Sequence, residues 1–185
     1  ISLSIFFASG ANIRHILGLF AGGIIFLFIL IKMAPYRMQR FLVFMNPEHD
    51  PMGFGYQMTQ ALLALGSGGL WGAGLGQSRQ KFNYLPEPVT DSIFAVLGEE
   101  LGMIGAVVVV TLFLFVAWRG LRIAARAPDE FGRLLAVGIV AWVVFQAFIN
   151  ISAITGLIPH TGIPLPLISY GGTSLAVPLA AFGIL

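Results

Sequence analysis

Cysteine is absent from this sequence of 185 residues, which excludes a disulfide framework, a thiolate metal site and a cysteine nucleophile. Charge is also scarce: Asp, Glu, Lys and Arg make up 10% of the residues, against about 25% in soluble domains. The net charge is only +2, and we expect no nucleic acid among the partners. Because hydrophobic residues make up 57% of the chain, its composition indicates an integral membrane protein.

Apolar runs divide the chain into segments of membrane-helix length. An α-helix needs about 20 apolar residues to cross the hydrocarbon of a bilayer. The chain begins without Met and ends inside an apolar run, so we expect a fragment of a longer protein. The sequence predicts a single all-α, polytopic transmembrane domain over residues 1–185, with membrane helices at about 1–9, 13–34, 92–118, 134–158 and 174–185.

Arginine is concentrated in one short predicted loop, and this concentration orients the helices. The four arginines are Arg119, Arg122, Arg126 and Arg133. Positively charged short loops of membrane proteins face the cytoplasm, so we expect this loop inside and the long segment 35–91 outside. Basic residues of the outer segment, such as Arg40, oppose this rule, although long loops translocate largely regardless of charge.

The predicted outer segment, residues 35–91, has internal structure. Tyr36 to Met45 mixes basic and apolar residues as an amphipathic surface helix does, and Tyr56 to Leu65 predicts a second helix, too short to span. A glycine-rich run follows at 66–76. It lacks the Lys and Ser/Thr of a phosphate-binding P-loop and the strand of a dinucleotide-binding turn. Close packing or a hinge is therefore favoured over nucleotide binding.

Asp91 stands at the predicted start of the helix at 92–118, and an ionisable residue beside lipid is a functional candidate by default. Two compatible interpretations remain open. Asp91 is a helix N-cap, or it is a general base that accepts a proton from a bound alcohol. A glycosidase-type pair with Glu99 or Glu100 is disfavoured, because Glu99 lies about 12 Å along a helix axis and Glu100 points to the opposite side.

Other polar residues near the outer face are weaker candidates. Arg79 and Lys81 suit a phosphate group, or they extend to lipid headgroups. Gln146 and Asn150 lie four residues apart on one helix face, a spacing typical of hydrogen bonds between membrane helices. His160 lies in a predicted loop, where a lone histidine is usually solvated.

The segment TGIPLPLISYGGTSL, from Thr161 to Leu175, predicts a structured loop that leads into the last helix. Pro164 and Pro166 block a regular helix before the glycine pair that follows them. The loop lies on the same predicted outer side as Asp91, so a shared site is geometrically reasonable. Its hydroxyl side chains are Ser169, Tyr170 and Thr173.

Two long motifs occur in an order that is typical of one family. The first runs from GLGQSRQKFNYLPE to TDSIFAVLGEELG, and the second is ISAITGLIPHTGIPLPLISYGG. In these motifs the chain resembles the SEDS family of peptidoglycan polymerases, which includes the FtsW, RodA and SpoVE branches, and it is most similar to the FtsW branch. It departs from the family pattern at Ser92, where Phe is usual, and at Val89, where His is usual. Neither change removes the carboxylate.

The resemblance implies a bundle of about ten transmembrane helices, of which this chain covers roughly the C-terminal half, with a large outer loop that holds short helices. It implies a glycosyltransferase of the bacterial cytoplasmic membrane that polymerises lipid II, a lipid-linked disaccharide precursor, outside the cytoplasm during division or cell-shape maintenance. Asp91 would be the catalytic residue. The substrate-binding residues would be Arg79, Lys81, Ser169, Tyr170, Gly171 and Gly172.

The resemblance also implies partners, namely a class B penicillin-binding transpeptidase and other divisome or elongasome proteins. No metal ligand is predicted, and a divalent cation is the one cofactor left open. Two other functions remain open. A flippase for the lipid-linked precursor would share the interrupted helices, although it would place ionisable residues near the bilayer midplane rather than at the outer edge. A non-catalytic division scaffold remains open because of the departures at Ser92 and Val89.

Overall fold

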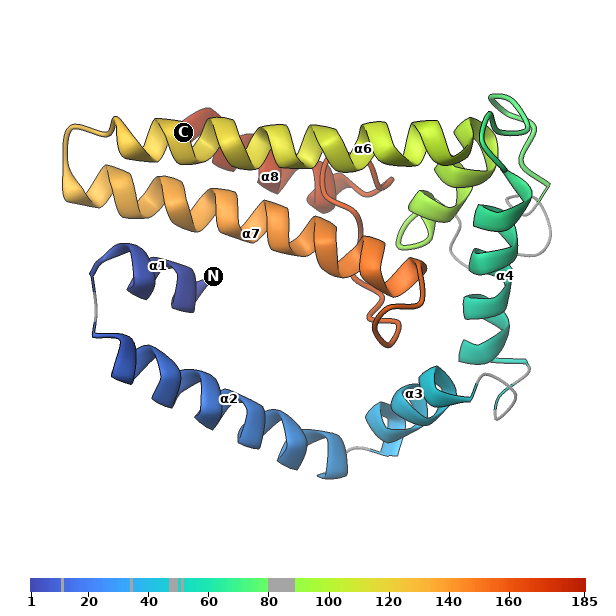
Figure 1. The fold of residues 1–185 in the computed structure, drawn as a ribbon, viewed down its shortest axis with the longest axis horizontal. Coiled ribbons are helices and arrows are strands. Elements are labelled where there is room, and N and C mark those ends of the chain that lie inside the picture. The colour runs from blue at the N-terminus through green and yellow to red at the C-terminus, as the bar shows by residue number, and fades with distance from the viewer. Residues whose placement is uncertain (11, 34, 47–49, 51, 80–88) are drawn as a thin grey trace.

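The computed structural model describes all residues except 11, 34, 47–49, 51 and 80–88. The part of the chain that it describes is helical and contains no β-strand, which confirms the predicted all-α class. The helices are labelled as in Figure 1: α1 (Ser2–Ala8), α2 (Ile13–Met33), α3 (Pro35–Met45), α4 (Phe54–Ser67), α6 (Ile93–Ala125), α7 (Glu130–Ile154) and α8 (Gly172–Ile184).

Three of the described helices are long and apolar enough to cross a membrane: α2 with 21 residues, α6 with 33 and α7 with 25. α6 and α7 run side by side in opposite directions as a hairpin, and α4 lies across the end where α6 begins (Figure 1). These three helices form the core, whereas α2 has no buried residue. The buried core residues are Ala61, Ala64, Phe94, Ala95, Val96, Val109, Phe113, Val143, Ala147, Ile154 and Leu165.

α6 is longer than the sequence predicts. The prediction ended this helix at residue 118 and placed the arginines in the loop after it. α6 continues to Ala125 because most residues of its last turns are good helix formers, Gly120 excepted, and Pro128 is the first proline after them. Arg119 and Arg122 therefore lie on the helix, and the Arg122 guanidinium stacks 4.0 Å from the centre of the Trp118 ring.

α7 begins and ends four residues earlier than the predicted range of 134–158. It begins at Glu130 because the Asp129 carboxylate accepts a hydrogen bond from the Gly132 N–H at 2.9 Å and so caps the first turn. It ends at Ile154, and Gly156 follows with φ of +72°, a left-handed conformation that suits glycine. The connection between α6 and α7 is therefore only residues 126–129.

The other helices begin and end within two residues of their predicted ranges. The segment predicted at 35–91 contains α3 and α4, the two short helices that the amphipathic and apolar patterns indicate. The loop rich in proline and glycine leads into α8 as predicted, and α8 begins at Gly172. Local sequence pattern is therefore sufficient for these elements, because most of their ends lie beside glycine, proline or polar residues.

The glycine-rich run packs against an interruption in α6. Gly102 interrupts the helix with φ of +68° and ψ of −168°, and the Met103 N–H donates instead to the Gly69 carbonyl at 2.9 Å. A Cβ atom at Gly102 would lie 2.4 Å from the main-chain nitrogen of Gly72. Only glycine permits this conformation and this approach, so the close-packing interpretation of the run is confirmed. The junction holds the first turns of α6 against the end of α4.

Candidate functional site

Asp91 lies in the turn before α6, and its carboxylate faces the ring of His160. Asp91 Oδ2 lies 3.1 Å from His160 Nε2, and the two side chains are 13% and 9% exposed. The Thr90 hydroxyl donates a longer hydrogen bond, 3.3 Å, to Asp91 Oδ1. The two members of the pair are 69 positions apart in the sequence, so only the folded chain brings them together.

Asp91 is not the cap of α6. The helix begins at Ile93, and the cap position falls to Ser92, whose side chain makes no capping hydrogen bond. The Ser92 hydroxyl instead accepts a hydrogen bond from Gln57 Nε2 at 3.4 Å. The cap interpretation of Asp91 is therefore wrong, because the main chain turns one residue later than the sequence indicates. The general-base interpretation stays a prediction.

His160 is not a solvated loop histidine, as the sequence suggested. Its main-chain carbonyl accepts a hydrogen bond of 2.9 Å from Arg40 Nη1 of α3. The Arg40 guanidinium also stacks 4.6 Å from the ring centre of Phe54 in α4. Sequence reasoning did not include His160 or Arg40 among the residues of the site. The available signal was the position of His160 inside the long motif at 151–172.

Asn150 of α7 joins two of the segments that form the site. It is 2% exposed, and its Nδ2 donates to the main-chain carbonyls of Asp91 and Ile163, each at 2.7 Å. Gln146, one turn earlier, donates from Nε2 to the Pro164 carbonyl at 3.0 Å. The two amides thus bind main-chain carbonyls rather than another helix, because the turn before α6 and the proline-containing loop leave these carbonyls without helical partners.

The loop before α8 is tied to the main chain that precedes α6. The Ser169 hydroxyl donates to the Thr90 carbonyl at 2.5 Å and accepts a hydrogen bond from the Leu165 N–H at 2.7 Å. The Tyr170 N–H donates to the Val89 carbonyl at 2.8 Å, whereas the Tyr170 side chain is exposed. Ser169 therefore holds the site together, and a direct contact of Ser169 or Tyr170 with substrate stays a prediction.

The remaining predicted substrate-binding residues lie at the edges of this arrangement. Arg79 is exposed, and its main-chain N–H donates to the Glu99 carboxylate at 3.0 Å. Lys81 lies outside the described residues. Gly171 is the N-cap of α8 and Gly172 its first residue. A role of these four positions in substrate binding stays a prediction.

Glu99 of α6 binds the segment that follows the glycine-rich run. This buried carboxylate accepts a hydrogen bond from the Ser78 hydroxyl at 2.5 Å on one oxygen and the Arg79 N–H on the other. Both oxygens therefore accept hydrogen bonds from residues that follow the glycine-rich run. This geometry agrees with the expectation that Glu99 does not act with Asp91 as a glycosidase-type pair.

The electrostatic environment keeps Asp91 ionised. Burial raises the pKa of the Asp91 carboxyl, but the hydrogen bond and the charge of His160, with smaller contributions from the main chain and Thr90, bring the net pKa below its ordinary value. Asp91 is thus a carboxylate at neutral pH and can accept a proton, although it is a weaker base for it. Among the described residues, no three His, Asp or Glu side chains gather as a metal ion requires, and a divalent cation stays a prediction.

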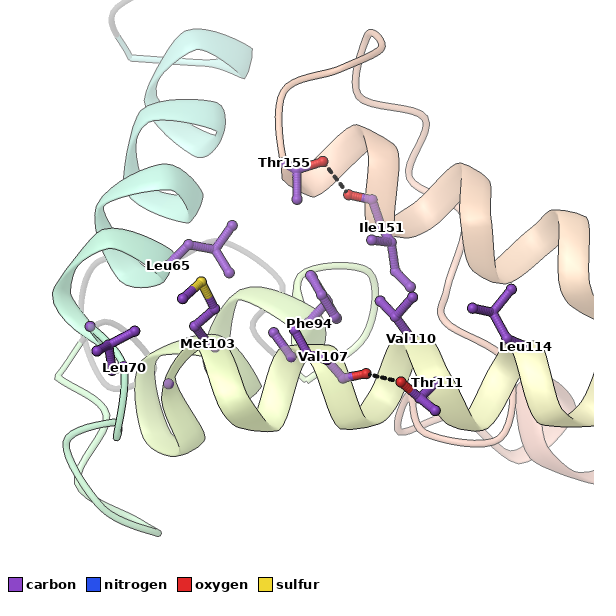
Figure 2. A pocket seen from close by; sticks show the side chains of 14 residues that line it. Leu65, Leu70, Phe94, Met103, Val107, Val110, Thr111, Leu114, Ile151 and Thr155 are labelled. Atoms are coloured by element: carbon purple, nitrogen blue, oxygen red, sulfur yellow. Dashed lines mark hydrogen bonds between the residues drawn. The ribbon is translucent and has the colours of Figure 1, made fainter.

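An apolar cavity of about 800 Å³ lies between α4, α6 and α7 (Figure 2). Phe94, one turn along α6 from Asp91, contributes to its lining, together with aliphatic side chains such as Leu65 and Val110. The Thr111 hydroxyl, which also lines the cavity, donates to a carbonyl of its own helix, as the Thr155 hydroxyl does (dashed in Figure 2). The described lining therefore presents hydrocarbon, which suits a lipid chain.

The whole chain matches one known protein family. The sequence model of that family, FTSW_RODA_SPOVE, described as cell cycle protein, covers residues 1–185. Stage V sporulation protein E of Bacillus subtilis is 52% identical over 179 residues, which are 97% of this chain and 49% of that protein. The probable peptidoglycan glycosyltransferase FtsW of Geobacter metallireducens is 47% identical over 185 residues, 100% of this chain and 49% of its own length. The chain thus spans about half the length of these curated relatives.

The fold is also similar to that of a solved structure. The similarity has a TM-score of 0.71 at 27% sequence identity and covers 98% of this chain and 50% of the solved chain. That structure is described as "Structural coordination of polymerization and crosslinking by a peptidoglycan synthase complex". The arrangement in Figure 1 is therefore similar to about half of a larger membrane chain.

Proposed function

Because this chain belongs to the FtsW/RodA/SpoVE family of cell cycle proteins, we propose that the protein is a peptidoglycan glycosyltransferase that polymerises lipid II. Relatives that are 47% and 44% identical are named probable peptidoglycan glycosyltransferases. The observation that carries the proposal is the ionised Asp91 carboxylate, held against His160 where distant segments of the chain meet. The polymer would serve division, sporulation or the maintenance of cell shape.

Asp91 is the general base of the proposed reaction. Its carboxylate takes the proton of the acceptor sugar hydroxyl while that oxygen attacks the anomeric carbon of the lipid-linked donor. The bond from the anomeric carbon to the polyprenyl diphosphate breaks, and its electron pair leaves with the diphosphate. A positioned general base contributes about 10²–10⁴-fold to such a rate.

The donor has a charged part and an apolar part, and this chain offers groups for both. Arg79 and Lys81 are proposed to stabilise the charge that develops on the diphosphate. The cavity between α4, α6 and α7 is proposed to hold part of the polyprenyl chain, since its described lining is hydrocarbon. The loop from Ser169 to Gly172 would border the sugar.

The site is proposed to face the outside of the cytoplasmic membrane. Asp91 lies at one end of the α6–α7 hairpin and the arginines at the other, and the positive end of a membrane helix pair usually faces the cytoplasm. The proposed partner is a class B penicillin-binding transpeptidase, supported by the likeness to a chain of a complex for polymerization and crosslinking. Other divisome or elongasome proteins follow from the family alone.

The activity is tested with purified full-length protein and lipid II in detergent, where polymer formation measures glycosyl transfer and transport across a bilayer cannot occur. We expect Asp91→Asn to lower polymerisation by about 10²-fold or more, because an amide cannot act as the base. Asp129→Asn is the matched control, since Asn caps α7 as well as Asp does. If Asp91→Asn keeps activity within about twofold of the parent protein, the chemistry lies elsewhere.

The orientation is tested with single cysteines in a version of the full-length protein that has no other cysteine. Tyr170 is 81% exposed near the site, and Phe131 is 74% exposed at the arginine end. An impermeant thiol reagent added to intact cells or spheroplasts should label Tyr170→Cys and not Phe131→Cys. Labelling of Phe131→Cys alone would reverse the proposed topology.

A further inference from the structure

We propose that His160 is a positioning residue, which holds the Asp91 carboxylate in one orientation and stabilises its negative charge. The inference rests on the proposed role of Asp91 as the general base. It adds a second residue to the reaction, and that residue acts through Asp91 rather than on the substrate.

The geometry of the Asp91–His160 pair gives the two carboxylate oxygens different roles. His160 Nε2 lies 3.1 Å from Oδ2, and it donates either as the protonated ring or as the tautomer with hydrogen on Nε2. Asp91 Oδ1 accepts the longer bond of 3.3 Å, from the Thr90 hydroxyl. Oδ1 is therefore the oxygen that can turn to an acceptor hydroxyl while Oδ2 stays bound.

His160 is itself held in place by a hydrogen bond to its main chain and by apolar neighbours. Arg40, 120 positions earlier, donates to its main-chain carbonyl at 2.9 Å. Apolar side chains of α3 and α4 border the same small cavity as the His160 ring, among them Phe44, Phe54 and Met58. A ring with a tethered main chain and apolar neighbours has few orientations available, so it can impose one orientation on its partner.

The charged groups around His160 determine how its removal changes the pKa of Asp91. In the described part of the chain, the charged side chains that contact His160 are Arg40 on α3 and Asp91, while α4 contributes apolar side chains. Asn150 of α7, which binds the Asp91 carbonyl, is neutral. Burial is the largest influence on the Asp91 carboxyl; without the imidazole, the hydrogen bond and the charge that oppose it are lost, and the pKa of Asp91 rises. A base with a raised pKa becomes protonated at higher pH.

The test measures kcat and KM for lipid II as a function of pH in the full-length protein. We expect His160→Ala to lower kcat by about 10–100-fold through misplacement of the base, with little change in KM. The acid limb of the kcat profile should move to higher pH. His160→Gln retains a side-chain donor without the charge, so it should recover part of kcat and move the acid limb less than His160→Ala does. His15→Ala, at an exposed position in the first turn of α2, is the matched control and should change neither.

If the acid limb of the kcat profile lies at the same pH in both His160 variants as in His15→Ala, the proposal is overturned. If His160→Ala does not fold, His160→Gln alone decides through the position of its limb. The Asp91→Asn variant distinguishes a failure of the proposed base from a failure of the proposed role of His160. If it polymerises normally, the proposed base is wrong; if it is inactive and the limb does not move, only the role of His160 is wrong.

Discussion

The two ends of the α6–α7 hairpin differ in how exposed their polar residues are and in which partners these residues bind. At the end where α6 begins, buried polar groups bind partners far away in the sequence: the Asn150 amide binds the Asp91 carbonyl across 59 positions. At the other end, exposed charged groups bind neighbours, as Arg133 does with Glu130 three residues away. Buried contacts between distant segments fix a geometry, whereas exposed local contacts leave the charges in water.

The difference favours the end with Asp91 as the place of the proposed reaction. A catalytic base has to be held in one orientation and shielded from bulk water, and the environment of Asp91 meets both conditions. The arginine end has charge without enclosure, which is sufficient to orient helices in a membrane. Substitutions of the same kind at the two ends should therefore have unequal effects.

The largest expected difference is between two glycines. Gly102→Ala would place a Cβ 2.4 Å from the Gly72 nitrogen, at φ and ψ values that are essentially restricted to glycine. We expect it to destabilise the protein by about 3 kcal/mol or more. At Gly132 the new Cβ would meet only the Asp129 side chain, at 3.0 Å, and the effect should stay within about 0.5 kcal/mol.

Thermal unfolding of the full-length protein in detergent, followed by tryptophan fluorescence, measures both glycine variants. Equal unfolding midpoints for Gly102→Ala and Gly132→Ala would remove the distinction between the two ends of the hairpin.

The next difference concerns two polar anchors. Asn150→Ala removes the buried amide that donates to the carbonyls of Asp91 and Ile163, and it should cost about 2 kcal/mol or more. Asp129→Ala removes a cap in an exposed turn and should cost about 1 kcal/mol. Only Asn150→Ala should also lower polymerisation, because it frees the main chain of the base. Retained activity in a destabilised Asn150→Ala protein would separate folding from positioning.

A smaller effect is expected from acid. The folded-state pKa of Asp91 lies below its ordinary value of 3.8, so the unfolded chain binds the proton first as the pH falls. The stabilisation from the Asp91–His160 pair is therefore complete above that ordinary value and is lost as the pH falls through the lower folded-state pKa. Unfolding midpoints from pH 7 down to pH about 3 should fall less in His160→Ala than in the parent protein. Parallel profiles would show that the pair does not stabilise the fold.

The smallest effect is expected at the arginine end. Arg133 and Glu130 form an ion pair whose side chains are 40% and 65% exposed, and such pairs contribute about 0–1 kcal/mol. Arg133→Gln should therefore leave the unfolding midpoint and polymerisation nearly unchanged. A loss of polymerisation similar to that of Asn150→Ala would mean that the arginine end also takes part in the reaction.

Local pattern was sufficient for most helices and insufficient at one junction. Five of the described helices begin and end within two residues of the predicted ranges, because proline, glycine and polar clusters bound them in the sequence. At the α6–α7 junction the prediction treated charged residues as loop. Arginine is a good helix former, so charge alone does not end a helix, and α6 continues to Ala125.

The sequence by itself determined the all-α membrane class, the approximate helices and the choice of Asp91, since hydrophobicity is local and a carboxylate beside lipid is conspicuous. Only the tertiary structure decided which residues surround that carboxylate. Arg40, Asn150 and His160 lie on α3, on α7 and in the loop after it, and no periodicity connects them. Burial and hydrogen bonding between distant segments depend on how the helices pack, and that packing made a histidine expected in solvent a hydrogen-bond partner of the Asp91 carboxylate.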